Sequence, residues 1–226
     1  MLDVKNMSAR DLEKIGELED VWPFVCTKVT PLLTGDGLIV PVETLNKCVT
    51  IHIKRRIAER DPTTLLADVR DLLRTGMSGL DTTLLHLRDD ELVVRTVELW
   101  RFFYRSILPY CDAVFLPLQS EFDGAGPLMG PAESARFFDR QKVVPRDMRS
   151  VRKLTMISFR DWVVLPIMSR LLKICASETM PVPQPLVLSL LQCTSILASV
   201  HSADDRQARL DELCALVRTK IVRSRS

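Results

Sequence analysis

The side chains that could perform catalysis are few and are spread along the 226-residue chain. The three histidines are His52, His86 and His201, and none lies in a recognisable catalytic signature. Nucleophilic catalysis needs a serine or cysteine within hydrogen-bond reach of such a base. The stretch GMSG differs from the G-x-S-x-G nucleophile elbow, which also requires a preceding strand. We therefore predict no catalytic residue and a protein that is not an enzyme.

Cofactor and metal chemistry find no better support in the sequence. GAGPLMG, residues 124–130, resembles a phosphate-binding loop, but it contains proline and lacks the Lys-Ser/Thr ending. The six cysteines are scattered, never as C-x-x-C, and most have apolar neighbours, which is typical of reduced core thiols. The carboxylate pairs Asp89-Asp90 and Asp204-Asp205 precede helical patterns, where capping explains them. We predict no metal, no cofactor and a reducing, intracellular compartment.

Basic residues gather in one segment of an otherwise balanced chain. The formal net charge is +2, which does not indicate a nucleic-acid partner. Between residues 136 and 153, seven basic residues stand against two acidic ones. One hypothesis is a surface for an acidic partner or for phosphoinositide headgroups, and the alternative is a solvated linker. The candidate partner-binding residues are Arg136, Arg140, Lys142, Arg146 and Arg149.

Helices must position these groups, because the composition and the hydrophobic periodicity both indicate an all-α fold. The chain is 46% hydrophobic and 27% charged, has only eight glycines, and shows no long two-residue alternation. In 61–76, Asp61 is suited to cap a helix, Pro62 fits its first turn and Gly76 can end it. We predict a single domain over 1–226, with 123–150 as a loop or linker that holds one short helix. Other helices are expected at 41–60, 185–200 and 204–222.

An uncharged stretch, 179–203, is long enough to raise the question of a membrane span. Its prolines shorten the candidate helix, and Ser189, Gln192, Ser195 and Ser199 recur at spacings of three and four. These spacings place the polar side chains along one helical stripe. We predict a core helix with one wetter face. The charged amino-terminal residues show no pattern of a secretory signal.

The most apolar part of the chain is 102–122, FFYRSILPYCDAVFLPLQSEF. Its few polar residues follow one narrow stripe, as expected for a helix surrounded by others. Pro109 and Pro117 each remove a backbone donor and should bend or break the helix, which would then be two helices in series. Residues 159–166, FRDWVVLP, repeat the pattern F-x4-[IV]-L-P of residues 102–109. We predict two long, proline-kinked central helices that pack together, surrounded by amphipathic helices.

Three stretches resemble the HbrB-like family, which includes the Protor proteins of animals and related fungal proteins. They are 21–53, 102–122 and 151–166, and their most specific parts are L-P-Y-x-x-A-V-F-L-P-L-Q-x-E-F and S-F-R-D-x-x-V-L-P. The resemblance implies a non-catalytic accessory or adaptor subunit of target of rapamycin complex 2 (TORC2) that supports TOR signalling. It also implies docking on the Rictor-type scaffold and, through that scaffold, contact with the TOR kinase.

The resemblance carries further expectations. It implies a cytoplasmic protein that acts with its complex at the periphery of the plasma membrane. A small GTPase or an anionic membrane is the expected second partner, and a helical module that binds either one through basic surfaces is the alternative function. The polar residues of the family motifs either stabilise helix packing or touch a partner: Arg105, Asp112, Gln119, Arg160 and Asp161.

Overall fold

The structure is a computed structural model that describes residues 21–37, 40–80, 82, 84–140, 146–177, 183–201 and 205–223. Over these residues the chain is helical and has no strand, which confirms the all-α prediction. The chain divides into two compact units. The first unit runs to Gly76 and resumes at Ile107–Thr155, and the second contains Met77–Ser106 and everything from Met156 onward. A single domain over the whole chain stays a prediction.

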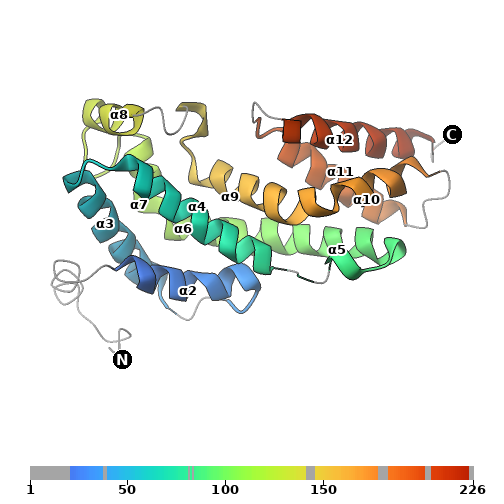
Figure 1. Ribbon diagram of the computed structural model, residues 1–226, viewed down its shortest axis with the longest axis horizontal. Coiled ribbons are helices and arrows are strands. Elements are labelled where there is room, and N and C mark those ends of the chain that lie inside the picture. Colours follow the sequence, from blue (N-terminus) through green and yellow to red (C-terminus); the bar gives the residue numbers. More distant parts are fainter. Residues whose placement is uncertain are drawn as a thin grey trace. The chain divides into compact units, whose positions relative to one another are not determined.

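The first unit contains α2, α3, α6, α7, α8 and most of α4 (Figure 1). Helix α3 packs against α2, α6 and α7, and α7 packs against α8. The expected segment 41–60 forms α3, and its apolar face, which includes Leu45, Val49 and Ile53, is buried. Residues 123–150 contain α8 and a short 3₁₀ turn, η5 (Arg146–Met148), and their assignment as a loop or linker stays a prediction. The bounds are α2 (Trp22–Thr34), α3 (Val42–Ala58), α4 (Pro62–Gly79), α6 (Leu108–Val114), α7 (Leu116–Phe122) and α8 (Pro131–Asp139).

Helix α4 begins where the sequence predicts, but it ends later than predicted. Asp61 Oδ1 accepts a hydrogen bond from the Thr64 backbone N–H at 3.0 Å, which confirms the expected cap. The expected end at Gly76 is wrong, because α4 continues to Gly79. A Cβ atom on Gly76 would lie only 2.5 Å from Leu33 Cβ of α2. Gly76 is therefore needed for the close approach of α2 and α4, not for a turn.

We expect Gly76→Ala to lower the free energy of unfolding by about 1–3 kcal/mol, because overpacking forces the neighbouring helix to move. Urea denaturation measures the change. The control is a double-mutant cycle with Leu33→Gly, which removes the Cβ and the outer side-chain atoms that the new methyl group meets. Equal costs of Gly76→Ala in both backgrounds would contradict this explanation.

A side chain from α3 compensates for the break between α6 and α7. Pro117 has no backbone N–H and cannot bond to the Ala113 carbonyl one turn earlier. Asn46 Nδ2 donates hydrogen bonds to the carbonyl oxygens of Ala113 and Val114, both at 2.8 Å. The interruption expected at Pro117 is present at Phe115, between the two short helices.

Asn46→Ala should lower the free energy of unfolding by about 1–3 kcal/mol, since it leaves these carbonyls without their donor. The exposed neighbour Lys47 offers the control: Lys47→Ala should change little. Thermal denaturation of both variants tests the assignment. If the two variants have the same melting temperature as the wild type, Asn46 does not support the break.

The loop that resembles a phosphate-binding sequence is organised by a buried carboxylate instead. Glu121 is 1% exposed, and its Oε1 and Oε2 accept hydrogen bonds from the backbone N–H groups of Leu128 and Met129 at 2.9 and 3.1 Å. Gly124 adopts a φ of 67°, which favours glycine, and Gly126 packs against the carboxylate. Two backbone donors of the loop, those of Leu128 and Met129, are thus already occupied by Glu121.

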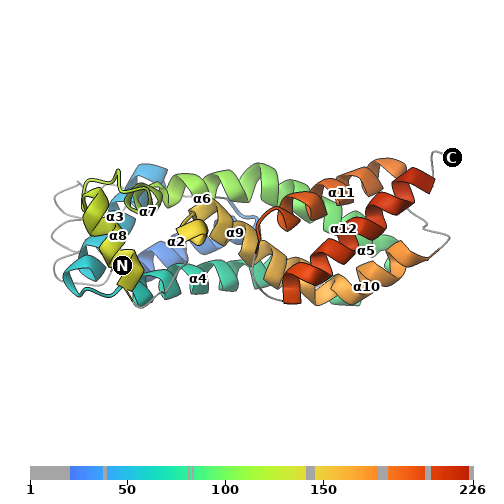
Figure 2. The same cartoon turned by 90° about the horizontal axis from the view of Figure 1, so that it is seen from above.

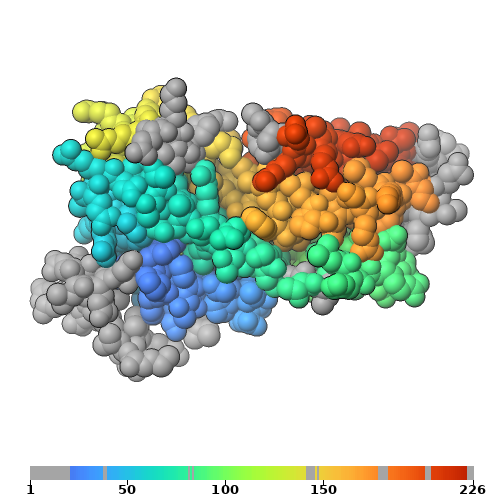
Figure 3. Space-filling view, viewed as in Figure 1, coloured from blue at the N-terminus to red at the C-terminus, as the bar shows by residue number. Residues whose placement is uncertain are grey.

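The second unit contains α5, α10, α11 and α12, together with a short turn η2 (Leu84–His86). Helix α11 packs against α5 and α12, and α10 also packs against both (Figure 2). In Figure 3 the atoms of α10 and α12 pack directly against each other. The buried face of α12 is the predicted one, including Leu210, Leu213 and Val217. The bounds are α5 (Asp89–Phe102), α10 (Leu165–Ala176), α11 (Gln184–Ala198) and α12 (Asp205–Arg223).

The repeated F-x4-[IV]-L-P pattern corresponds to a repeated backbone feature. A π-helical turn occupies Phe103–Ile107 (η3) before Pro109, and another occupies Arg160–Val164 (η6) before Pro166. Each turn ends two residues before its proline, and in η6 the Leu165 N–H bonds to the Arg160 carbonyl five residues back. The Phe103 and Phe159 rings stack at 4.2 Å. The expected proline kinks stay a prediction.

None of the described helices combines the length and the apolar character that crossing a membrane requires.

Candidate partner-binding surfaces

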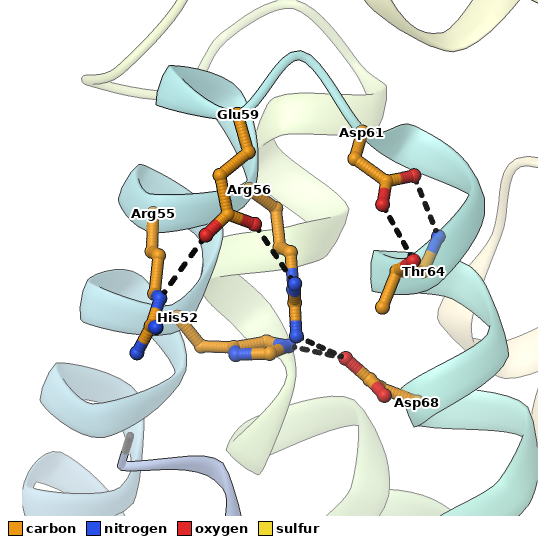
Figure 4. Close-up of polar contacts among 7 residues, drawn as sticks. All are labelled: His52, Arg55, Arg56, Glu59, Asp61, Thr64 and Asp68. Atoms are coloured by element: carbon orange, nitrogen blue, oxygen red, sulfur yellow. Dashed lines mark hydrogen bonds and ion pairs between the residues drawn. The ribbon is translucent and has the colours of Figure 1, made fainter. Parts of the chain in front are cut away.

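Histidine and cysteine form no evident reactive centre among the described residues. His52 is 1% exposed, its ring stacks on Trp22 at 4.4 Å, and its Nε2 lies 3.0 Å from Asp68 Oδ2. Arg56 shares the Asp68 carboxylate at 3.3 Å, so that α3 and α4 are joined by two side chains on one acceptor (Figure 4). The buried position of His52 favours a structural role in the α3–α4 contact.

The six cysteines are free thiols, and several are deeply enclosed. Burial raises the pKa of Cys48 and of Cys175 to about 11 and that of Cys111 to about 12, and it also raises the pKa of Cys193. A high thiol pKa suppresses the thiolate, which is the nucleophilic form. Among the described residues, no group of histidine, cysteine and carboxylate side chains is arranged to hold a metal ion.

The basic segment is partly neutralised by one carboxylate. Arg146 and Arg149 lie 2.9 and 2.5 Å from the two oxygens of Asp139. The Arg149 side chain is 9% exposed and lies over the Phe138 ring, so it serves packing more than recognition. Arg136 and Arg140 are exposed, and among the described residues neither has an ion-pair partner. Lys142 lies outside the described residues.

Hydrogen bonds from Arg146 and Arg149 lower the pKa of Asp139 to about 2. A carboxyl group whose pKa falls on folding stabilises the folded state above its ordinary pKa and loses this effect as the pH falls through the folded value. We therefore expect Asp139→Asn to lower the melting temperature at pH 7 and to have a smaller effect near pH 2, where the carboxyl group is partly protonated in the folded state. Thermal denaturation at both pH values measures the difference.

The control for Asp139→Asn is Glu133→Gln, on the same helix and also exposed. Glu133 has no ion-pair partner within the described part of the chain, so its variant should melt near the wild-type temperature at both pH values. A deficit of Asp139→Asn that is as large at pH 2 as at pH 7 would contradict the arginine contacts.

Two polar residues of the first family motif attach the start of α9 (Val151–Phe159). Asp112 Oδ2 lies 2.6 Å from Arg152 Nη1. Gln119 accepts a hydrogen bond from the Val151 N–H at 2.9 Å and donates another to Asp123 at 3.0 Å. Both contacts lie within the first unit, where they are consistent with the structural interpretation of these residues.

The second family motif supplies a buried ion pair in the second unit. Arg160 is 1% exposed, and its Nε lies 2.7 Å from Asp161 Oδ1. The other oxygen of Asp161 lies 2.5 Å from Nη1 of Arg206 on α12. Asp161 thus joins a buried arginine to an exposed one.

Arg105 differs from the other motif residues because it is exposed and, among the described residues, has no ion-pair partner. It lines a groove on the second unit with Arg101, Ser189 and Gln192. Sequence reasoning did not single out Arg101. The polar stripe of 185–200 could have indicated this groove, because two residues of the stripe, Ser189 and Gln192, line it.

Exposed apolar side chains also lie in the family motifs, and sequence reasoning did not select them as site residues. Tyr110 on α6 is 45% exposed and Leu116 on α7 is 56% exposed. Trp162 in η6 is 44% exposed. Aromatic residues are enriched in the cores of protein interfaces and among their hot spots. Tyr110 and Leu116, both in the first unit, are the candidate apolar contacts, and we call them the motif surface.

These features define an all-α protein whose candidate functional groups lie on its surface. The profile of the HbrB-like family matches residues 17–172. The chain belongs to the HbrB-like family, which confirms the resemblance of its motifs.

Two known proteins show what the chain is similar to. It is 28% identical over 213 residues to the target of rapamycin complex 2 subunit bit61 of Schizosaccharomyces pombe. It is 21% identical over 244 residues to the target of rapamycin complex 2 subunit BIT61 of Saccharomyces cerevisiae. The matches cover 91% and 96% of this chain but only 49% and 44% of those relatives. No solved structure matches the chain.

Proposed function

We propose that this chain is a non-catalytic accessory subunit of TORC2 that acts by binding. The observation that carries the proposal is the similarity over nearly the whole chain to two fungal proteins that are named as subunits of this complex. The structure supports binding over catalysis, because His52, Cys48 and Cys111 are buried in the core of the first unit and are not accessible to a substrate. The proposed location is the cytoplasm, with peripheral attachment at the plasma membrane through the complex.

The proposed partner is the Rictor-type scaffold and, through it, the TOR kinase. The motif surface is the proposed point of attachment. Tyr110 and Leu116 expose apolar area although both lie in the most specific motif of the family, and an apolar contact that excludes water stabilises a complex in proportion to the area removed from water.

The test is affinity purification of the tagged chain from fission yeast cells that lack bit61, with mass spectrometry of the bound proteins. Recovery of the scaffold and the kinase is expected. Tyr110→Ser combined with Leu116→Ser should reduce recovery about ten-fold or more, as the loss of interface hot spots does. The matched control is Leu188→Ser combined with Val222→Ser, which removes exposed apolar area from the second unit. No recovery by the folded wild type would overturn the proposal.

The exposed Arg136 and Arg140 support a second candidate, a basic surface for an anionic membrane or a small GTPase. Flotation with phosphatidylserine vesicles tests the membrane, and pull-down with purified small GTPases tests the other partner. Binding that high salt weakens and that Arg136→Glu with Arg140→Glu abolishes would favour this function. Unchanged binding by the charge-reversed variant would exclude the basic surface as its cause.

A further inference from the structure

Helices α5 and α11 pack against each other in the second unit (Figure 2), and a groove is lined by residues of α5 with η3 on one side and of α11 on the other. It is lined by Trp100, Arg101, Tyr104, Arg105, Ser189 and Gln192, and its volume is about 600 Å³. This volume is within the range of ligand sites, roughly 300–1,000 Å³. Helix α11 lies beyond residue 172, so one wall of the groove is outside the region that the family profile matches.

The charge of the groove is not balanced by its own lining. Arg101 and Arg105 are both exposed, and no carboxylate lines the groove with them. Arg101 donates a hydrogen bond to Ser189 Oγ at 2.7 Å, and this hydroxyl is neutral. Two like charges four residues apart on a helix disfavour each other. Other arginines of the second unit do have carboxylate partners: Arg88, Arg95, Arg160, Arg170 and Arg206.

The aromatic lining gives the groove an apolar component. The rings of Trp100 and Tyr104 lie 5.1 Å apart, with Trp100 buried and Tyr104 half-buried. Gln192 is exposed opposite them and carries both a donor and an acceptor. A complementary ligand therefore combines carboxylates, for the arginines, with an apolar side chain for the aromatic lining.

We propose that this groove binds a short acidic protein segment that carries one apolar side chain. Arg101 and Arg105 contact its carboxylates, and Tyr104, whose ring packs on the buried Trp100, contacts the apolar side chain. The positive charge favours such a segment over a neutral one, because a charge-assisted hydrogen bond is stronger than a neutral one. This inference goes beyond the proposed function, and its test needs no other subunit of the complex.

The experiment is fluorescence anisotropy with the purified full chain and a labelled peptide of aspartates around a central leucine. The control peptide has asparagines in place of the aspartates. We expect saturable binding of the aspartate peptide that weakens with added salt. Arg101→Glu with Arg105→Glu should weaken it about ten-fold or more. Arg88→Glu with Arg95→Glu changes the charge by the same amount on exposed residues outside the groove and should leave affinity within about two-fold.

A variant that binds the peptide more tightly would show that the groove recognises it, because misfolding can only weaken binding. Gln192→Lys adds a third positive charge to the lining and should tighten binding about two- to five-fold, as one exposed ion pair does. Equal affinity for the two peptides, no saturable binding, or equal loss in the two double variants would overturn the proposal. Self-association of the chain would also overturn the proposal if the Arg101→Glu, Arg105→Glu variant abolished it, because the groove would then bind a second copy of the chain.

Discussion

Asp161→Ala is expected to lower the free energy of unfolding by about 3–5 kcal/mol, the cost of breaking a buried ion pair from one side. Arg160 is buried, and Asp161 is the carboxylate that neutralises it at 2.7 Å. The alanine variant leaves the guanidinium charge in place without this carboxylate. Urea denaturation followed by circular dichroism gives the free energy.

The control is Arg206→Ala, which removes the exposed arginine from the same carboxylate. Its cost should stay below about 1 kcal/mol, because exposed ion pairs contribute little. Replacing both members of the buried pair, as Arg160→Met with Asp161→Ala, should recover part of the stability. If Asp161→Ala costs no more than Arg206→Ala, the buried pair is not important for folding.

Glu121→Ala should destabilise the first unit by roughly 2–6 kcal/mol, since each of two backbone donors left without an acceptor costs about 1–3 kcal/mol. Glu121 is buried and accepts the N–H groups of Leu128 and Met129. Hydrogen exchange should show faster exchange of these two amides, in addition to the loss of stability in urea.

Gly126→Ala provides the matched test of the same loop. A Cβ atom there would overlap the Glu121 carboxylate, so the substitution should destabilise the wild type but have a smaller effect in the Glu121→Ala background. Additive effects, or unchanged exchange at Leu128 and Met129 in Glu121→Ala, would contradict the role of the carboxylate.

The two largest expected effects on stability thus concern residues that hold helices and loops in place. The proposed binding residues, in contrast, lie at the surface. Arg101, Arg105, Tyr110 and Leu116 are all exposed. Substitutions at exposed positions usually change stability by less than about 0.5 kcal/mol. A loss of binding in those variants can therefore be separated from a loss of folding by melting temperature.

Local sequence patterns were sufficient to predict most of the helices. The apolar faces of 41–60, 61–76 and 204–222 are buried as expected, because a helix with a continuous apolar stripe must cover it. The repeat of F-x4-[IV]-L-P predicted two similar helices but not their π-helical turns. The position of a proline shows which backbone N–H donor is missing. How the helix compensates for the lost hydrogen bond depends on its packing.

The sequence by itself determined the all-α class and the family, because these follow from residue type and spacing. Only the tertiary structure decided how individual side chains are used. It paired Asp139 with Arg146 and Arg149, assigned Gly76 to a contact with Leu33, and brought Arg101 and Arg105 together with Ser189. These contacts depend on which helix faces which, and interactions between segments distant in sequence leave no local pattern.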